Sequence, residues 1–175
     1  MSGEQKVVII TGATHGIGGE LVKSFRDRNY RVVANSRSIK PSSEPDVLNV
    51  PGDIADDATA ERIVAQALAR FGRIDTLVNN AGVFIAKQFV DHTDADYASI
   101  VGVNLGGFFR LTKRVASEML RRGSGHIVQI TTTLVDHPNS SVPAALAARR
   151  SFFRAVFPVT FVTGFPRLAD CTSFA

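Results

Sequence analysis

The strongest constraint in this sequence is a glycine-rich turn, Thr11-Gly-Ala-Thr-His-Gly-Ile-Gly18, placed directly after an apolar run, Lys6–Ile10. An unbroken apolar run of this length is typical of a β-strand covered on both faces in a parallel sheet. Apolar residues at helical spacing follow the turn, at Ile17, Leu21, Val22 and Phe25. A strand, a tight glycine turn and a helix N-terminus together suit the pyrophosphate of a dinucleotide. The alternative is an ordinary glycine-rich connection between a strand and a helix.

The chain continues to alternate between short apolar strands and amphipathic helices. We expect further strands at Arg31–Ala34, Asp46–Val50, Ile74–Val78 and His126–Ile130, and helices at Asp56–Phe71 and about Asp94–Arg122. This rhythm predicts an α/β fold with a parallel sheet and helices on both of its faces. If the last helix faces the sheet, its later half buries Leu105, Phe108, Phe109, Val115, Met119 and Leu120.

The composition changes near the end of the chain. Residues 147–175 hold four arginines, one acid and six of the twelve phenylalanines. The rest is nearly neutral, so the net charge of +4 belongs mainly to this segment and we expect no nucleic-acid partner. We therefore expect a domain over residues 1–146 and an atypical basic, phenylalanine-rich tail over residues 147–175. A shifted reading frame, an unusual splice or a truncated gene model would explain the change.

Other classes of protein are disfavoured by simple counts. The single cysteine, Cys171, permits neither a disulfide within the chain nor a cysteine-based zinc site, and we expect no metal site. No apolar run reaches the roughly 20 residues that a membrane helix needs, so we expect no membrane partner. The polar start, Met1–Gln5, lacks the apolar core of a signal peptide, and we expect a cytoplasmic protein.

A second motif, Asn79-Asn-Ala-Gly82, stands at the end of the fourth expected strand. With both motifs at this separation, the sequence resembles the short-chain dehydrogenase/reductase family from Lys6 to about Leu134. The resemblance implies a Rossmann-like, doubly wound sheet, here incomplete at about five strands. It also implies a nicotinamide cofactor and hydride exchange between that cofactor and a carbonyl or hydroxyl group.

The resemblance carries over to single positions. Asp53 resembles the acid that contacts the adenine ring, although it also suits a turn or cap before the following helix. Asn79 and Ala81 match residues that line the cofactor cleft, with Asn79 partly structural. Asn104 matches a catalytic asparagine that kinks its helix and anchors a water in a proton relay. The cofactor contacts implied are Gly12, Thr14, His15, Gly16, Ile17, Gly18, Arg37, Asp53, Ile54, Asn80, Ala81 and Gly82.

The preference for one cofactor depends on the end of the second strand, Ala34-Asn-Ser-Arg37. A carboxylate there would bind the adenosine ribose and repel a 2′-phosphate, and the sequence has none. Arg37 is suited to pair with that phosphate, so we expect NADP rather than NAD. The alternative is that Arg37 is only a solvated loop cation.

The family's catalytic pattern is incomplete in this sequence. Thr132 best matches the hydroxyl residue that polarises the substrate oxygen. The family's tyrosine and lysine should follow some 13 to 17 residues later, where Ala144–Arg150 stands instead. The only tyrosines are Tyr30 and Tyr97, and the last lysine is Lys113. Arg149 supplies a cation near the expected place but cannot shuttle a proton. His137 has an ordinary pKa near neutrality, and the alternative is that it is only a solvated loop histidine.

Three functions remain open from the sequence. The first is an NAD(P)-dependent oxidoreductase with an impaired catalytic centre, acting on a small carbonyl or alcohol. The second is a cofactor-binding module without catalysis, and the third is a fragment that folds poorly. Family members are often dimers or tetramers, so a homo-oligomer is among the expected states.

Overall fold

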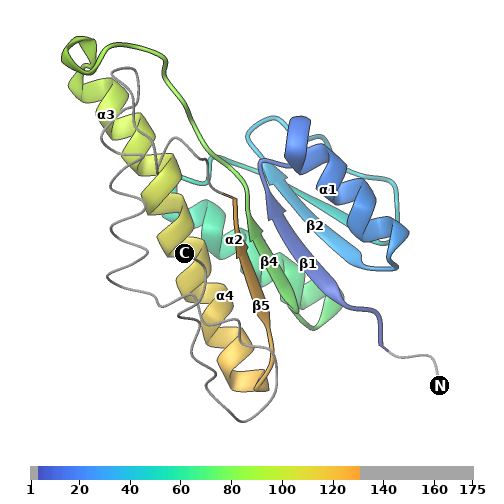
Figure 1. Ribbon diagram of the computed structural model, residues 1–175. Coiled ribbons are helices and arrows are strands. Elements are labelled where there is room, and N and C mark those ends of the chain that lie inside the picture. The colour runs from blue at the N-terminus through green and yellow to red at the C-terminus, as the bar shows by residue number, and fades with distance from the viewer. Residues whose placement is uncertain (1–3, 131–175) are drawn as a thin grey trace, which may run out of the picture.

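The structure is a computed structural model, and it describes residues 4–130 of the chain (Figure 1). Five strands form one parallel sheet in the order β3-β2-β1-β4-β5. Their bounds are β1 (Val7–Thr11), β2 (Arg31–Ser36), β3 (Val47–Pro51), β4 (Thr76–Asn79) and β5 (His126–Gln129). The predicted parallel α/β sheet is confirmed, and its strand order is that of a Rossmann-like fold.

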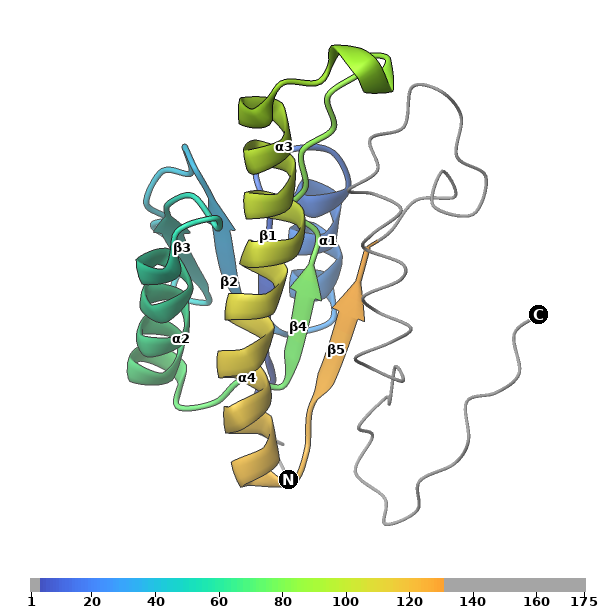
Figure 2. The ribbon, with the colours of Figure 1, turned by 90° about the vertical axis from the view of Figure 1, so that its left-hand side faces the viewer.

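Helices cover both faces of this sheet. Helix α1 (Gly16–Asp27) packs on one face, and α2 (Asp57–Phe71) and α4 (Phe108–Arg122) pack on the other (Figure 2). Alternate residues of each strand supply the two cores: Val8 and Ile10 face α1, whereas Val7 and Ile9 face α2 and α4. Strands buried on both faces explain why these segments are apolar without interruption.

The long helix predicted over Asp94–Arg122 has three parts. Helix α3 (Asp94–Val101) leads into a π-helical turn, η2 (Gly102–Gly107), and then into α4. Thr93 caps α3 through a reciprocal pair of hydrogen bonds with Asp96. A short 3₁₀ turn that the sequence did not predict, η1 (Phe89–Asp91), precedes α3.

The predicted buried face of α4 was partly wrong. Phe108, Val115 and Met119 are buried as expected, but Phe109 and Leu120 are 45% and 74% exposed, and Leu105 is half-buried. Adjacent helical residues point about 100° apart, so Phe108 and Phe109 cannot both face the sheet. Leu111 and Thr112 complete the buried stripe instead.

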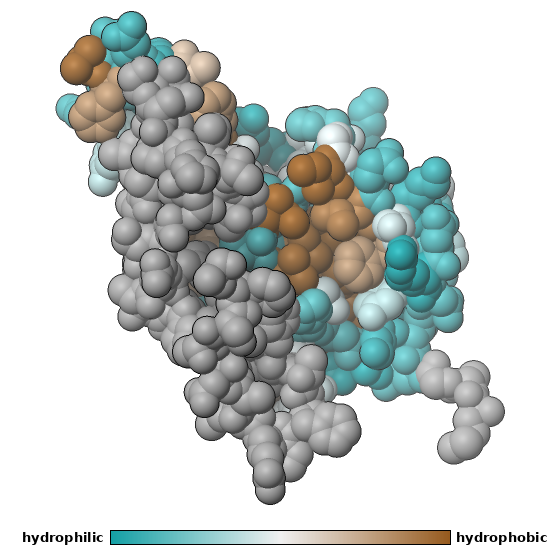
Figure 3. Space-filling view, viewed as in Figure 1, coloured by the Kyte–Doolittle hydropathy of each residue, from teal (hydrophilic) through white to brown (hydrophobic). Residues whose placement is uncertain are grey.

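An exposed apolar loop projects from the end of β4. The segment between β4 and α3 carries Phe84, Phe89 and Val90, of which Val90 is 83% exposed. Brown and tan atoms gather at this protruding corner in the upper left of Figure 3. None of the helices within residues 4–130 is both long and apolar enough to cross a membrane.

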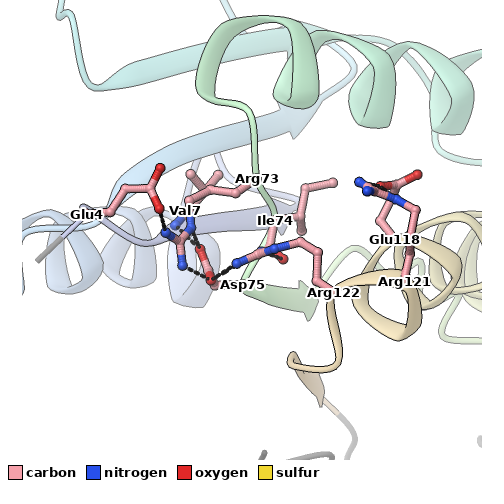
Figure 4. A network of polar contacts seen from close by, with 8 residues as sticks. All are labelled: Glu4, Val7, Arg73, Ile74, Asp75, Glu118, Arg121 and Arg122. Carbon is pink, nitrogen blue, oxygen red and sulfur yellow. Dashed lines mark hydrogen bonds and ion pairs between the residues drawn. The ribbon is translucent and has the colours of Figure 1, made fainter.

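A charged cluster joins the elements at the amino ends of the strands (Figure 4). Asp75 accepts hydrogen bonds from the Val7 N–H at 2.8 Å and from Arg73 at 2.7 and 2.8 Å, and Arg122 lies 3.4 Å from it. Glu4 pairs with Arg73 from the chain before β1. We call Arg73, Asp75 and Arg122 the amino-edge clamp, because they tie β1, β4 and the end of α4 together.

Candidate functional site

The candidate site lies where the chain leaves the carboxyl ends of β1 and β4. From β1 the chain crosses to β2 on one side, and β4 lies on the other side of β1. In open α/β sheets, ligands bind in the crevice at such a topological switch point. The two sequence motifs meet here, because the Asn80 side-chain amide donates to the Gly12 carbonyl oxygen at 3.2 Å.

Close packing leaves no room for a side chain at two glycines of the turn, Gly12 and Gly18. A Cβ on Gly18 would stand 2.0 Å from the Gly12 carbonyl oxygen and 2.7 Å from the Asn80 amide nitrogen. A Cβ on Gly12 would stand 3.0 Å from the Ala81 Cα, and Gly12 has a φ of +66°. Gly12 and Gly18 therefore let the helix, the strand and the second motif approach one another directly.

Gly16 has a different role, since it faces open space. Its φ is +55°, and no atom lies within 4 Å of where its Cβ would be. Thr14, His15, Gly16 and Ile17 are all exposed around it. The helical spacing groups Ile17 with Leu21 and Phe25, but Ile17 is 61% exposed whereas the other two pack against the core. Ile17 lies in the first turn of α1, beyond the part that covers the sheet.

The N-terminus of α1 carries no competing polar group of its own. The N-cap residue, His15, makes no side-chain cap hydrogen bond, and the first turn holds no acidic residue. The first N–H groups of a helix have no partner within the helix and carry a partial positive charge. With its glycines, exposed amides and positive helix end, this turn fits a diphosphate.

Thr11 and Asn80 join the carboxyl ends of β1 and β4 by hydrogen bonds. The Thr11 hydroxyl accepts hydrogen bonds from the N–H groups of Asn80 and Ala81, at 3.1 and 3.0 Å. The Asn80 side chain donates back to the carbonyl oxygens of Thr11 and Gly12. The Asn80 side-chain amide and the N–H groups of Asn80 and Ala81 are thus committed to the end of β1, which fixes this motif beside the glycine turn.

The loop after β3 combines a turn residue with a core residue. An Asp53 carboxylate oxygen accepts the Ala55 N–H at 2.9 Å, so the turn role that the sequence left open is present. Ile54 is only 6% exposed, and a Cβ on Gly107 would lie 2.9 Å from its side chain. The Ile54 side chain therefore packs against η2.

Asn104 lies inside the π-helical turn and is 3% exposed. Its side chain accepts the Val83 N–H at 2.8 Å and donates to the Val83 carbonyl oxygen at 2.9 Å. The expected helix distortion at Asn104 is present, and π-turns of this kind often occur at functional sites. The amide group holds the chain just after Gly82 against the helix.

The end of β2 presents a cation beside a buried hydroxyl. Ser36 is half-buried, and its hydroxyl oxygen is buried without a hydrogen-bond partner among residues 4–130. Arg37 is exposed and makes no ion pair with a residue in the described range 4–130. A hollow of about 500 Å³ lies elsewhere, at the amino ends of the strands beside Lys23, Arg26 and Tyr30. It is remote from the glycine turn, since those residues stand at the far end of α1 and before β2.

Comparison with known proteins decides the family. A family model described as short chain dehydrogenase matches residues 6–151, which is most of the chain. The chain belongs to the short-chain dehydrogenase family. The match runs past Leu134, where the resemblance read from motifs ends, and past residue 146, the expected domain boundary.

Curated relatives agree with this assignment. L-fucose dehydrogenase from Mus musculus is 34% identical over 134 residues, covering 73% of this chain and 48% of the relative. A 3-oxoacyl-(acyl-carrier-protein) reductase from Salmonella typhimurium is 29% identical over 155 residues, covering 85% of this chain and 64% of the relative. The chain thus spans about half to two thirds of the length of the curated relatives that it matches.

Solved structures of the family share the fold. A 3-ketoacyl-(acyl-carrier-protein) reductase from Brucella melitensis, complexed with NADH, has a TM-score of 0.79 and 27% identity, covering 87% of this chain and 67% of that one. A short-chain dehydrogenase from Streptomyces avermitilis has a TM-score of 0.77 and 27% identity, covering 86% and 57%. ElxO with NADP bound, at 23% identity and a TM-score of 0.78, shows the fold alone.

The rest of the predicted catalytic centre lies outside the described residues. Thr132 stands beyond residue 130, and so do His137, Arg149 and the tail. Within residues 4–130, Tyr30 packs edge-on against Phe25 before β2, at the amino edge of the sheet, and Tyr97 is exposed on α3. No group of three or more potential metal ligands occurs among the described residues.

Sequence reasoning named Asn79 as partly structural but missed the row of polar side chains to which it belongs. Asn35, Thr11, Asn79 and Gln129 lie at the ends of β2, β1, β4 and β5, in the order of the sheet, on the face toward α2 and α4. We call these four residues the polar row. The Asn79 amide donates to the Thr112 hydroxyl at 2.9 Å, which ties β4 to α4. In the sequence, each residue of the polar row is a polar residue at the end of an apolar strand, and this is the signal that could have identified it.

Proposed function

We propose that this chain binds a nicotinamide dinucleotide across the carboxyl edge of its sheet, for hydride exchange with a small carbonyl or alcohol. One observation carries the proposal: the uncapped N-terminus of α1 follows β1 through a glycine turn at the switch point of the sheet. Family membership supports the same function, because short-chain dehydrogenases are NAD(P)-dependent oxidoreductases.

Different residues at the carboxyl edge of the sheet would hold different parts of the cofactor. The backbone of Thr14–Gly18 would hold the diphosphate, Arg37 and Asp53 the adenosine half, and Ala81 and Gly82 the other half. Asn104 would fix the chain after Gly82 through its two hydrogen bonds to Val83. When bound, the nicotinamide supplies or accepts the hydride. Thr132 would donate a hydrogen bond to the substrate oxygen.

NADP is the preferred cofactor in this proposal. The end of β2 offers Ser36 and Arg37 and no carboxylate. A guanidinium pairs strongly with a phosphate through charge-assisted hydrogen bonds, whereas a ribose hydroxyl gains much less from it. Arg37 is exposed and has no ion-pair partner among residues 4–130, so it is available to a 2′-phosphate.

A second candidate function is cofactor binding without turnover, and the catalytic pattern favours it. No tyrosine follows Tyr97 and no lysine follows Lys113 in the sequence. A positioned acid–base group contributes about 10² to 10⁴ in rate, so its loss leaves slow hydride transfer at best. We propose an impaired oxidoreductase, and the absence of any turnover would favour the second candidate.

Titration of the full chain with NADPH and NADH, followed by nicotinamide fluorescence, tests the binding. We expect NADPH to bind about tenfold more tightly than NADH, and Arg37→Ala to remove this difference. Arg28→Ala is the matched control, since Arg28 lies at the amino edge and its side chain, among residues 4–130, hydrogen-bonds to Ser24 alone. Equal affinities for the two cofactors would refute the preference, and no binding of either would refute the function.

Turnover is tested separately. Steady-state assays on a panel of ketones and secondary alcohols, with NADPH or NADP, should give rates about 10²-fold or more below those of family members that carry the tyrosine and lysine pair. Rates as high as those of such members would contradict the proposed impairment.

A further inference from the structure

Asn35 is among the most deeply buried polar residues of the described chain, at 1% exposure, and no function is yet attached to it. It stands near the end of β2, in register with Thr11 of β1 and Val50 of β3. Its side-chain amide donates to two backbone oxygens, those of Val50 at 2.9 Å and Gly52 at 3.1 Å. Asn35 therefore holds the chain as it leaves β3.

The backbone of Asn35 holds a second loop. Its carbonyl oxygen accepts the Ala13 N–H at 3.0 Å, inside the glycine turn after β1. One residue thus joins the diphosphate turn to the segment that carries Asp53. The neighbouring Ser36 carbonyl oxygen adds a further tie by accepting the Gly52 N–H at 3.1 Å. Gly52 has a φ of +149°, so the chain bends sharply at the point that Asn35 holds.

The other half of the crevice is braced without Asn35. Thr11 and Asn80 fix the turn after β4, and Asn104 fixes Val83. None of these hydrogen bonds involves β2 or β3. The two halves of the carboxyl edge, on either side of β1, are therefore held by separate sets of side chains.

We propose that Asn35 is a positioning residue for the adenosine half of the dinucleotide. This rests on the proposed function. Asn35 acts through the loops that it holds. Its side chain fixes the position of the Gly52 backbone and therefore of the adjacent Asp53. Arg37 follows Asn35 by two residues. Loss of its amide N–H donors frees the loop after β3 but leaves the loop after β4 in place. The affinities of the chain for the two halves of the cofactor should therefore change by different amounts.

Asn35→Asp is the sharpest variant, because it keeps the shape and removes both donors. The full chain is titrated with adenosine 2′,5′-bisphosphate and with reduced nicotinamide mononucleotide as probes of the two halves. We expect affinity for the bisphosphate to fall about tenfold or more, and affinity for the mononucleotide to stay within about twofold.

A pH series separates positioning from a general loss of structure. The introduced carboxyl is buried against carbonyl oxygens, which raises its pKa, and its protonated form regains one O–H donor. We expect the deficit relative to the wild-type chain to shrink between about pH 8 and about pH 5.5. A purely structural defect would weaken both probes together at every pH.

Asn49→Asp is the matched control for charge and chemistry. Asn49 lies on β3, donates its amide to the Lys40 carbonyl oxygen and touches neither loop of the crevice. We expect it to leave both probes unchanged. Asn35→Ser supplies a neutral second variant if Asn35→Asp does not fold, since its hydroxyl is too short to reach both carbonyl oxygens. Equal loss of both probes, or no loss of the bisphosphate, would overturn the inference. A wild-type chain that binds neither NADPH nor the bisphosphate would overturn the proposed function itself.

Discussion

The two edges of the sheet are held together by different chemistry. At the amino edge, the clamp of Arg73, Asp75 and Arg122 is charged, and Glu4 adds a further ion pair. At the carboxyl edge, the polar row makes neutral hydrogen bonds to backbone and hydroxyl groups. An edge that binds an anion gains from free amides and an uncompensated helix end. A buried carboxylate there would compete with the ligand, and the polar row contains none.

The largest effect that this comparison predicts is that of Gly18→Ala at the carboxyl edge. The added Cβ would stand 2.0 Å from the Gly12 carbonyl oxygen, so α1 must move away from the turn. We expect NADPH binding to be lost and the free energy of unfolding to fall by about 1–3 kcal/mol, measured by fluorescence titration and urea unfolding.

The adjacent glycine is a matched control. A Cβ on Gly19 would meet no atom closer than 3.8 Å. Gly19→Ala should keep NADPH binding and stabilise the chain by up to about 1 kcal/mol, because alanine favours a helix over glycine. Equal losses of NADPH binding in Gly18→Ala and Gly19→Ala would show that the defect comes from a side chain added to the helix, not from the close approach of Gly18 to Gly12.

At the amino edge, Asp75→Asn should lower stability without changing cofactor binding. The substitution removes the charge that Arg73 and Arg122 share and leaves the crevice untouched. We expect the free energy of unfolding to fall by about 2 kcal/mol, with NADPH affinity unchanged. Glu118→Gln, which removes the partner of the exposed Arg121, should change stability by less than about 0.5 kcal/mol. A loss of cofactor affinity in Asp75→Asn would mean that the two edges are coupled.

Acid should weaken the amino-edge clamp through Asp75. Burial raises the pKa of the Asp75 carboxyl, but the hydrogen bonds from Arg73 and Val7 outweigh burial and keep its pKa below the ordinary value. A lowered pKa adds stability above the unfolded value of about 3.9, and this is lost as the pH falls through the folded value. Urea unfolding of the wild-type chain and Asp75→Asn should therefore converge below about pH 4. A constant difference at all pH values would contradict the role of this charge.

Thr112→Val should give a smaller loss than Asp75→Asn, at the partner of Asn79 in the polar row. It removes the oxygen that accepts the buried Asn79 amide and keeps the shape of the side chain. We expect a loss of about 1 kcal/mol, independent of pH between about 4 and 8 and of salt, since both groups are neutral. A marked salt dependence would show that a charge contributes to this contact.

The sequence predicts the β1–turn–α1 unit well because each requirement is local. An apolar run, positive-φ glycines and a helix start all fall within about a dozen residues, and Gly12 and Gly16 have the expected backbone conformations. The parallel sheet follows from the same regular alternation, whereas its Rossmann-like order was expected from the family resemblance. Ile17 fits the helical spacing but is exposed, because helical periodicity does not show where a helix projects beyond its sheet.

The contacts between loops could not be predicted in the same way. Asn35 reads as one polar residue at a strand end, and its partners Val50 and Gly52 follow 15 and 17 residues later. The π-turn around Asn104 is likewise set by a pairing with Val83, 21 residues earlier. Such partners become visible only when the strands are placed side by side, which is why the polar row was missed.

The central claim is that the amides at the start of α1 hold the diphosphate of the cofactor. An NMR titration of the isotope-labelled full chain with NADPH tests it directly. We predict saturable shifts of the amide signals of Gly16, Ile17 and Gly18, with little change at Lys23 and Arg26 beside the amino-edge hollow. Binding that shifts the signals beside the hollow and leaves the three amides of α1 unmoved would contradict the account.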